Sequence, residues 1–450
     1  MAEAAACGQV AEVKASEPHG PWARLGELPS RRIAELVGAV AARGPRELGD
    51  LVQVLPPGSA IELRLSRARV DAEALLLALA AARRAGARLR VKLFNVEAAR
   101  APTPDGTAGG VARALAAALA PPPPEQLSQQ QHKQQQHQHH QHDQPAVGSA
   151  KPAASWSIEV TDCKLVDADA RALAEALLRG HATGTSPTLL RLDLSFNALD
   201  LAGVEALAEA VAAGCSICEL ALAGTCFSSS EAAAAGVAAL GRALAGRSQL
   251  YELDLSYVRG VGPAVEALMG GLTQRHGLLR KLSLVRCQLG AGEAALVARA
   301  LAASGCQLEE LDIGDNRLGD AGWTALAAAL RANRKLRRLL LWRTHAGPAG
   351  AREIVAALRS TGDSALEVLD LHSNGLLGDE GATVLASALV RETALRALNV
   401  SLCEVGDPGA LALAAALRGA GQGRRVDMLT SRISERCRQE LRALEALALG

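Results

Sequence analysis

The chain has 450 residues, of which 49% are hydrophobic and only 2% are aromatic, so its core is expected to be aliphatic. A formal net charge of +1 argues against nucleic acid or an anionic membrane as the partner. Nine irregularly spaced cysteines do not suggest a disulfide framework, and no apolar run reaches the roughly 18 residues that span a bilayer, so we expect a cytoplasmic protein.

Two segments precede the first repeat-like stretch. Residues 1–21 carry acidic residues and lack the apolar stretch of a secretory signal, so we expect a disordered tail. Residues 22–58 are expected to form a helical cap, because Ser30 suits an N-cap and apolar residues follow on one helix face, at Ile33, Leu36, Val37 and Val40. The phrase LGELPSRRIAELV faintly resembles the start of an F-box, so a separate adaptor module is the alternative.

Residues 59–120 read as two divergent repeats, with strands around Leu63 and Val91 and a helix at GGVARALAAALA. Residues 121–154 begin with four prolines and continue as a Gln- and His-rich tract that cannot form a core, so we expect disorder. Its position before the next strand predicts an insertion within a continuous repeat array. Metal binding by its histidines is the alternative to a tract without function.

Nine repeats are predicted over residues 155–431, the first of them around Ile158. The stretch TLLRLDLSFNALD has the form LxxLxLxxNxL, and the same frame returns along the chain. Its inner leucines lie 28, 33, 29, 29, 28, 30 and 29 residues apart, at Leu192, Leu220, Leu253, Leu282, Leu311, Leu339, Leu369 and Leu398. A fixed period of this length indicates stacked units rather than one globular core.

Each unit is expected to contain a strand, a turn, a helix and a loop. In LRLDLSFNAL apolar and polar residues alternate, which is typical of a strand with one buried face, and Asn197 then turns the chain and bonds open backbone groups. Cys163, Cys287 and Cys403 occupy the same position, whereas Val258 predicts an irregular turn. Residues 432–450 are expected to form a C-terminal capping helix.

The repeat LEELDIGDNRLGDAGWTALAAALRANRKL resembles a leucine-rich repeat of the ribonuclease-inhibitor type. The resemblance implies an α/β solenoid, a horseshoe with a parallel β-sheet on its concave face and α-helices on its convex face. It says little about the partner.

No motif for catalysis is found: the chain lacks a P-loop, an HExxH and a GxSxG elbow. The single CxxC at Cys215 and Cys218 is interpreted as packing, and the basic run at 331–338 as a solvated helix end. We therefore expect no enzyme activity, no cofactor and no metal.

The strand residues between the inward leucines are expected to form the partner-binding surface. Aspartate recurs at one position, three of the nine aromatic residues fall on this face, and arginines lie beside them. The candidate contact residues are Asp193, Phe196, Asp254, Tyr257, Arg286, Asp312, Asp315, Arg338, Trp342, Arg343, Asp370 and His372. The aspartates can also be solvated consensus residues without a partner.

These features favour a non-catalytic scaffold that binds another protein through its concave face and is monomeric alone. A structural subunit of a cytoskeletal or ciliary assembly is one alternative. The repeats also resemble those of the Ran GTPase-activating protein and of innate-immune sensors, but the acidic tail of the former and the P-loop of the latter are missing from the sequence.

Overall fold

The computed structural model describes residues 10–12, 60–66, 69–70, 75–76, 79–80, 83, 88–98, 110–121, 155–441 and 447–449, with gaps at 186, 275–276, 361–363, 390–392, 421–422 and 430–431. The chain divides into two compact units, residues 1–219 and 220–450. The predicted cap at 22–58 and nearly all of the predicted insertion at 121–154 lie outside the described residues. So does the predicted tail, apart from Val10–Glu12, which form strand β1.

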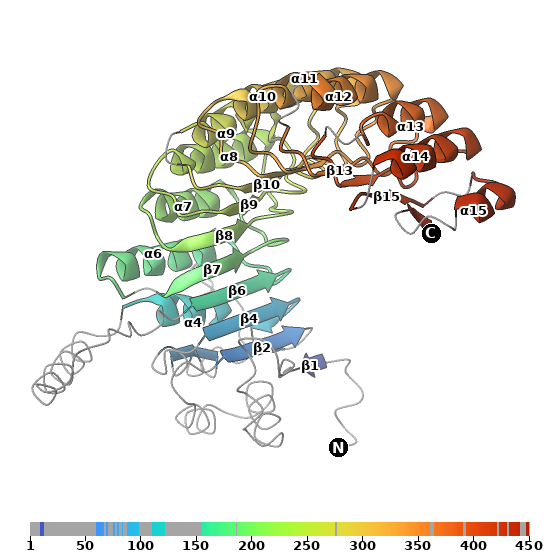
Figure 1. Cartoon of the computed structure of the whole chain (residues 1–450). Coiled ribbons are helices and arrows are strands. Elements are labelled where there is room, and N and C mark those ends of the chain that lie inside the picture. Colours follow the sequence, from blue (N-terminus) through green and yellow to red (C-terminus); the bar gives the residue numbers. More distant parts are fainter. Residues whose placement is uncertain are drawn as a thin grey trace, which may run out of the picture. The chain divides into compact units, whose positions relative to one another are not determined.

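In unit 1 the sheet order is β1, β2, β4, β6, β7 (Figure 1), and every pairing after the first is parallel. The strands are β1, β2 (Ala60–Ser66), β4 (Arg88–Phe94), β6 (Ser155–Thr161) and β7 (Thr188–Asp193), with a separate pair β3 (Arg69–Val70) and β5 (Glu97–Ala98). The helices are α4 (Gly110–Leu119), α6 (Asp167–Ala182) and α7 (Leu201–Ala212).

The predicted inner residues of unit 1 are direct neighbours in this sheet. Leu63 pairs with Val91, Val91 with Ile158, and Ile158 with Leu192. Because β4 and β6 pair directly, the chain between α4 and β6 joins two neighbouring repeats.

Unit 2 continues the same repeat. Its strands are β8 (Ile217–Ala221, which crosses the boundary), β9 (Glu252–Asp254), β10 (Lys281–Ser283), β11 (Glu310–Asp312), β12 (Arg338–Leu340), β13 (Val368–Asp370), β14 (Ala397–Asn399), β15 (Arg425–Met428) and β16 (Leu447–Leu449). Its helices are α8 (Ser230–Leu244), η3 (Gly262–Ala264), α9 (Val265–Leu272), α10 (Ala291–Ala302), α11 (Gly319–Leu330), α12 (Pro348–Ser360), α13 (Gly378–Ala386), α14 (Asp407–Ala420) and α15 (Glu435–Leu441).

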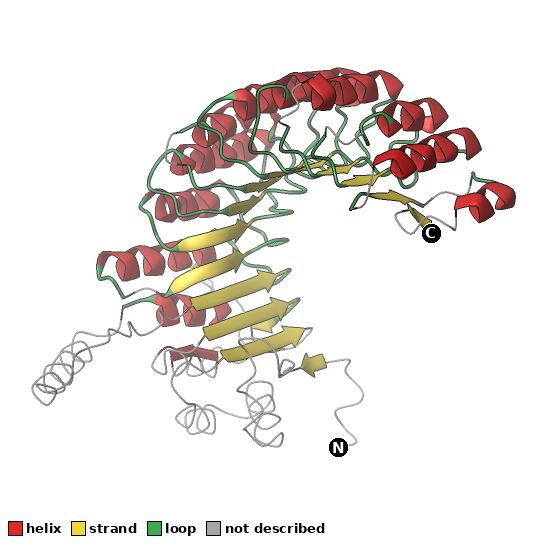
Figure 2. Cartoon of the chain, in the orientation of Figure 1, coloured by secondary structure: helices red, strands yellow, loops and turns green. Residues whose placement is uncertain are grey.

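The predicted inner leucines of unit 2 align in one register, from Leu253 through Leu311 to Leu398. Strand β15 continues this register, with Val426 paired to Leu398. Strands lie in one layer and helices in the other (Figure 2). This alternation of parallel strands and helices confirms the predicted α/β solenoid class.

The core of unit 2 lies between these layers. Leu311 and Leu339 are fully buried, as are small residues of the helix layer such as Ala327. Burying a leucine side chain stabilises the fold by about 1.5–3 kcal/mol. Since each strand pairs with both neighbours, the buried column fixes the register of the polar residues between the leucines.

Asn316 shows how the turn after a strand is held. Its Nδ2 donates to the carbonyl oxygens of Leu284 and Ile313 at 2.9 Å each, and its Oδ1 accepts from the backbone N–H groups of Cys287 and Leu289 at 3.0 Å each. The predicted role of asparagine at this position is confirmed. The predicted equivalence of cysteine is confirmed as well, since the thiol of Cys287 donates to Leu255 O at 3.2 Å.

Val258 has no polar group for this role, and its repeat is irregular in the helical part, whereas the prediction placed the irregularity in the turn. It is buried, its N–H makes only a long 3.4 Å contact with Leu255 O, and η3 precedes the eight-residue helix α9. By contrast, α10 and α11 each have 12 residues.

The chain end differs from the single helix predicted over 432–450. Helix α15 spans only Glu435–Leu441, and Leu447–Leu449 form β16, which pairs with β15. A helix there would leave the backbone groups at the edge of β15 unpaired, whereas a strand pairs with them.

Candidate partner-binding surface

One backbone position per repeat has a left-handed conformation. It directly precedes the Asn, Cys, Thr or Val turn residue, and its φ lies between 51° and 63° at Phe196, Gly224, Tyr257, Arg286, Asp315, Arg343, Ser373 and Leu402. For a residue other than glycine this conformation costs roughly 1–2 kcal/mol. In unit 2 the N–H of such a residue donates to the next repeat, as Asp315 N does to Trp342 O at 2.8 Å, which offsets the cost.

Four of the predicted contact residues share this position in unit 2, and we call Tyr257, Arg286, Asp315 and Arg343 the outer row. The guanidinium of Arg286 lies 5.7 Å from the centre of the Tyr257 ring. Asp315 pairs with Arg286 at 3.6 Å and with Arg343 at 3.5 Å. Tyr257 is 42% exposed and both arginines are exposed, so these interactions contribute only about 0–1 kcal/mol each to stability.

A second set, Asp312, Trp342, His372 and Asp370, forms what we call the inner row. Trp342 Nε1 donates to Asp312 Oδ1 at 3.1 Å. Its ring stacks on His372 at 5.1 Å between centres and 6° between planes. His372 Nδ1 in turn lies 2.8 Å from Asp370 Oδ1. All four side chains are partly exposed, so this aromatic stack is preorganised and accessible from solvent.

Gly314 makes room for this arrangement. A Cβ atom on Gly314 would lie 2.2 Å from Trp342 Cε2, so no larger residue fits beneath the indole. Gly314 was not among the predicted contact residues. The signal was present, since its counterparts in other repeats are Ser256, Trp342 and His372.

The recurring aspartates have a structural role. Asp254, Asp312 and Asp370 each use Oδ1 to accept the backbone N–H two residues later, at 2.9–3.0 Å. Burial raises the pKa of Asp312 to about 6, although its hydrogen bonds from Gly314 N and Trp342 Nε1 oppose the shift. The nearby charges of Asp370 and Asp254 add to it.

The remaining candidates lie elsewhere. Arg338 is exposed and pairs with Glu310 at 3.1 Å, one strand position before the inner leucine. Phe196 and Asp193 belong to unit 1, where Phe196 is 49% exposed and Asp193 is buried beside Arg191 at 2.8 Å. The structure therefore brings eight of the twelve candidates together in the outer and inner rows. The other four, Asp193, Phe196, Asp254 and Arg338, belong to neither row.

In the described part of the chain, no three His, Cys, Asp or Glu side chains are grouped to hold a metal ion. No helix among those residues has both the length and the apolar character needed to cross a membrane. Cys287 and Cys403 are buried, which raises the pKa of each thiol to about 12.

Four segments match the family described as Leucine Rich repeat, at residues 185–208, 306–327, 364–386 and 393–414. The "NACHT, LRR and PYD domains-containing protein 12" of Homo sapiens is 31% identical over 268 residues, which is 59% of this chain and 24% of that protein. The ribonuclease inhibitor of Sus scrofa is 30% identical over 252 residues, which is 55% of this chain and 52% of that protein.

A solved structure, that of the Rad7 and Elc1 complex in yeast, is 15% identical with a TM-score of 0.37, over 65% of this chain and 80% of that one. The chain spans between about a quarter and half of the length of the two curated relatives above. The family matches, the identity to ribonuclease inhibitor and the observed strand–turn–helix units agree with one another. The chain is a leucine-rich repeat protein of the ribonuclease-inhibitor-like type.

Proposed function

We propose that the chain is a non-catalytic scaffold that binds another protein through the strand-side surface of unit 2. The observation that supports this most is the pair of rows, in which Tyr257, Trp342 and their neighbouring arginines lie exposed or partly exposed along the repeats from β9 to β12. Tryptophan, tyrosine and arginine are the residues most enriched among the contacts that dominate protein–protein binding energy.

The small contribution of these exposed residues to folding stability supports a role in binding rather than in holding the fold. Exposed ion pairs such as Arg343–Asp315 add little to folding stability. In a complex, the same charges would be desolvated and could direct the orientation of the partner. We propose the cytoplasm as the compartment, because the buried thiols of Cys287 and Cys403 serve as hydrogen-bond donors in the free form.

The test begins with affinity purification of the full chain and identification of the co-purified protein by mass spectrometry. The dissociation constant is then measured by calorimetry for the native chain and for Trp342→Ala with Arg343→Ala. Loss of two central contacts should weaken binding by roughly 30-fold or more, which corresponds to about 2 kcal/mol. Arg259→Ala with Arg317→Ala removes two exposed arginines outside both rows and is the matched control.

An unchanged dissociation constant for the Trp342/Arg343 variant would show that the partner binds elsewhere. The non-catalytic part of the proposal has its own test. Mixing the chain with GTP-loaded Ran-type GTPase should leave phosphate release at its intrinsic rate, and faster release would mean that the chain regulates catalysis.

A further inference from the structure

The net charge of the chain is +1, but basic residues strongly outnumber acidic residues in one part of unit 2. Four segments (the connectors) run from the end of a helix to the start of the next strand, within residues 331–337, 359–367, 388–396 and 418–425, and we call their described residues the basic border. It contains nine Lys or Arg residues but one acidic residue, Glu367. The loops after the same strands, 341–347, 371–377, 400–406 and 429–434, contain two arginines and one glutamate. The positive charge therefore gathers where strands begin.

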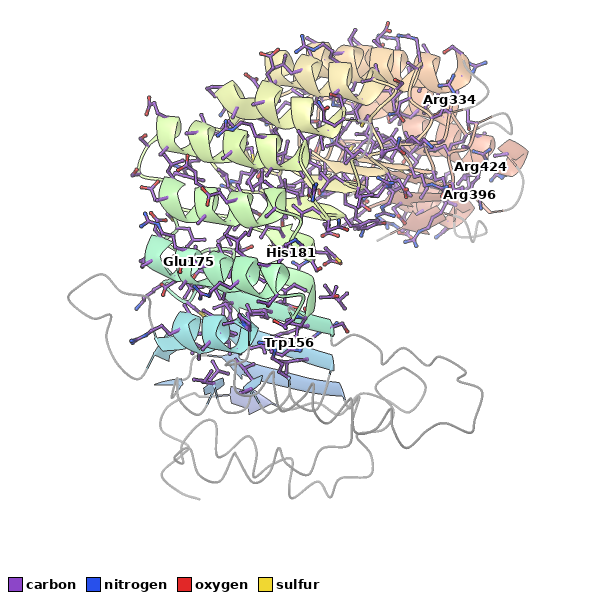
Figure 3. All side chains as sticks on the ribbon, turned by 90° about the vertical axis from the view of Figure 1, so that its left-hand side faces the viewer. Trp156, Glu175, His181, Arg334, Arg396 and Arg424 are labelled. Atoms are coloured by element: carbon purple, nitrogen blue, oxygen red, sulfur yellow. The ribbon has the colours of Figure 1, made fainter. Side chains whose placement is uncertain are left out.

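Backbone hydrogen bonds hold these connectors side by side. Glu367 N donates to Arg337 O at 2.8 Å, Arg396 N to Glu367 O at 2.8 Å, and Arg425 N to Arg396 O at 2.7 Å. Neighbouring strands lie about 4.8 Å apart, so these residues from distant parts of the sequence form one row, in which Glu367 stands between Arg337 and Arg396. Figure 3 shows three of these arginines, Arg334, Arg396 and Arg424, on the same side of the unit.

Several of these cations have partners within the chain. Ion pairs join Arg331 to Glu353, Arg337 to Glu367 and Arg425 to Asp427. The guanidinium groups of Arg334 and Arg424 donate to backbone carbonyl groups. Four others are exposed and meet no carboxylate among the described residues: Lys335, Arg359, Arg396 and Arg418. The border thus keeps cations available for an external anion.

The helix dipole accounts for only part of this excess. A dipole favours cations within the last turn of a helix, where Arg359 of α12 and Arg418 of α14 lie. Lys335 lies five residues after the end of α11 at Leu330, and Arg396 lies ten residues after the end of α13 at Ala386. The connector after α10, residues 303–309, ends an equally regular helix and contains no cation.

We propose that the basic border binds an acidic segment of a protein, a run of Asp and Glu side chains, separately from the strand-side surface. Eight of its nine cations are arginines, whose planar guanidinium group matches a carboxylate in a two-bonded geometry. Proteins that bind single-stranded nucleic acid stack the bases on aromatic side chains. The four connectors contain no Phe, Trp or Tyr, which favours a peptide.

The experiment measures fluorescence anisotropy of a labelled oligo-glutamate peptide titrated with the full chain. A neutral oligo-glutamine peptide and a single-stranded oligonucleotide serve as alternative ligands. Lys335→Glu with Arg396→Glu reverses two unpaired charges of the border. Arg259→Glu with Arg317→Glu changes the net charge equally but in loops at the opposite ends of strands.

We expect the native chain to bind oligo-glutamate, with an affinity that falls as salt rises. The border variant should bind about tenfold more weakly, since each exposed pair contributes up to about 1 kcal/mol and reversal adds repulsion. The opposite-edge variant should bind like the native chain. Arg359→Glu with Arg418→Glu should reproduce the border effect and guards against a folding defect in the first pair.

Three outcomes would overturn the proposal: no binding of oligo-glutamate, equal loss in the border and opposite-edge variants, or tighter binding of the oligonucleotide than of the peptide. Trp342→Ala with Arg343→Ala should leave oligo-glutamate binding intact. That result separates the border from the partner-binding surface, so either proposal can fail alone.

Discussion

The turns after β11 and after β9 in unit 2 solve the same backbone problem with different side chains. After β11, Asn316 satisfies two carbonyl oxygens and two N–H groups of neighbouring strands and turns. After β9, Val258 supplies only apolar contact. Both turns nevertheless keep a left-handed residue, with φ of 51° at Asp315 and 63° at Tyr257.

The difference appears on the helical side. The Asn316 turn leads into the 12-residue helix α11, whereas the Val258 turn leads through η3 into the eight-residue helix α9. The strands and their turns thus keep one backbone geometry, because these strands pair with a neighbour on each side. The difference between the two repeats lies in the length of the helix that follows. The four changes below test this contrast, in order of decreasing expected effect.

Asn316→Ala should cause the largest loss of stability. It would leave buried carbonyl and N–H groups of several residues without partners, and we expect a cost of about 3–5 kcal/mol in the free energy of unfolding. Chemical denaturation of the full chain, followed by circular dichroism, measures this. Val258→Ala, the matched change in the turn after β9, should cost only about 1–2 kcal/mol. Equal costs would show that the two turns are held by similar forces.

Gly271→Ala should weaken the contact between α8 and α9. The added Cβ would lie 2.2 Å from the backbone oxygen of Gly241, so the two helices must separate. We expect a loss of about 1–3 kcal/mol, as for other overpacked sites. Thermal denaturation reports the change, and an unaltered midpoint would mean that α9 already moves freely against α8.

Asp312→Asn should stabilise the regular repeat near neutral pH. Burial raises the pKa of Asp312 from 3.8 to about 6. At pH values between these two, the folded state therefore keeps the Asp312 carboxyl group protonated, whereas the unfolded state has released the proton. Stability associated with this proton is present at low pH and lost as pH rises through 6. An asparagine Oδ1 can still accept from Gly314 N, as Asn399 accepts from Ser401 N at 3.0 Å.

We therefore expect the variant to exceed the native chain by about 1–2 kcal/mol at pH 7.5, a value discounted for partial exposure. The advantage should shrink toward zero near pH 4. Denaturation curves across this range test it, and an advantage that does not vary with pH would rule out Asp312 as its source.

Gly270→Ala should have the smallest effect and the opposite sign from its neighbour. A Cβ at Gly270 meets nothing within 4 Å, and the residue lies inside α9. Replacing an exposed helical glycine with alanine should stabilise the helix by about 0.5–1 kcal/mol. Hydrogen exchange of the α9 amides should slow accordingly, and faster exchange would contradict a regular helix at this point.

The repeat frame was predictable because its signal is periodic. A leucine every 28 to 30 residues predicts buried strand positions, and Leu311, Leu339 and Leu369 lie side by side as expected. Strand β15 was not singled out because Val426 stands in place of leucine in an arginine-rich stretch. Residues 432–450 were predicted as a single helix because helical periodicity alone does not reveal that the edge of β15 can pair with a further strand.

The candidate surface was predictable in membership but not in geometry. Alternation places Asp312, Trp342 and His372 on one face, yet their hydrogen bond and ring stack depend on the space above Gly314. Whether these residues bind a partner stays a prediction. The basic border was hidden because its cations come from four connectors, and only the run around Lys335 is contiguous in sequence.

The left-handed position before each turn has a consequence for engineering. The described backbone tolerates phenylalanine, tyrosine, arginine, aspartate, serine, leucine and glycine at this position, at residues such as Phe196, Asp315 and Leu402. No β-branched residue occurs among them, as expected for this conformation. A designer could therefore exchange these side chains one repeat at a time, avoiding valine, isoleucine and threonine, and retarget the surface without rebuilding the scaffold.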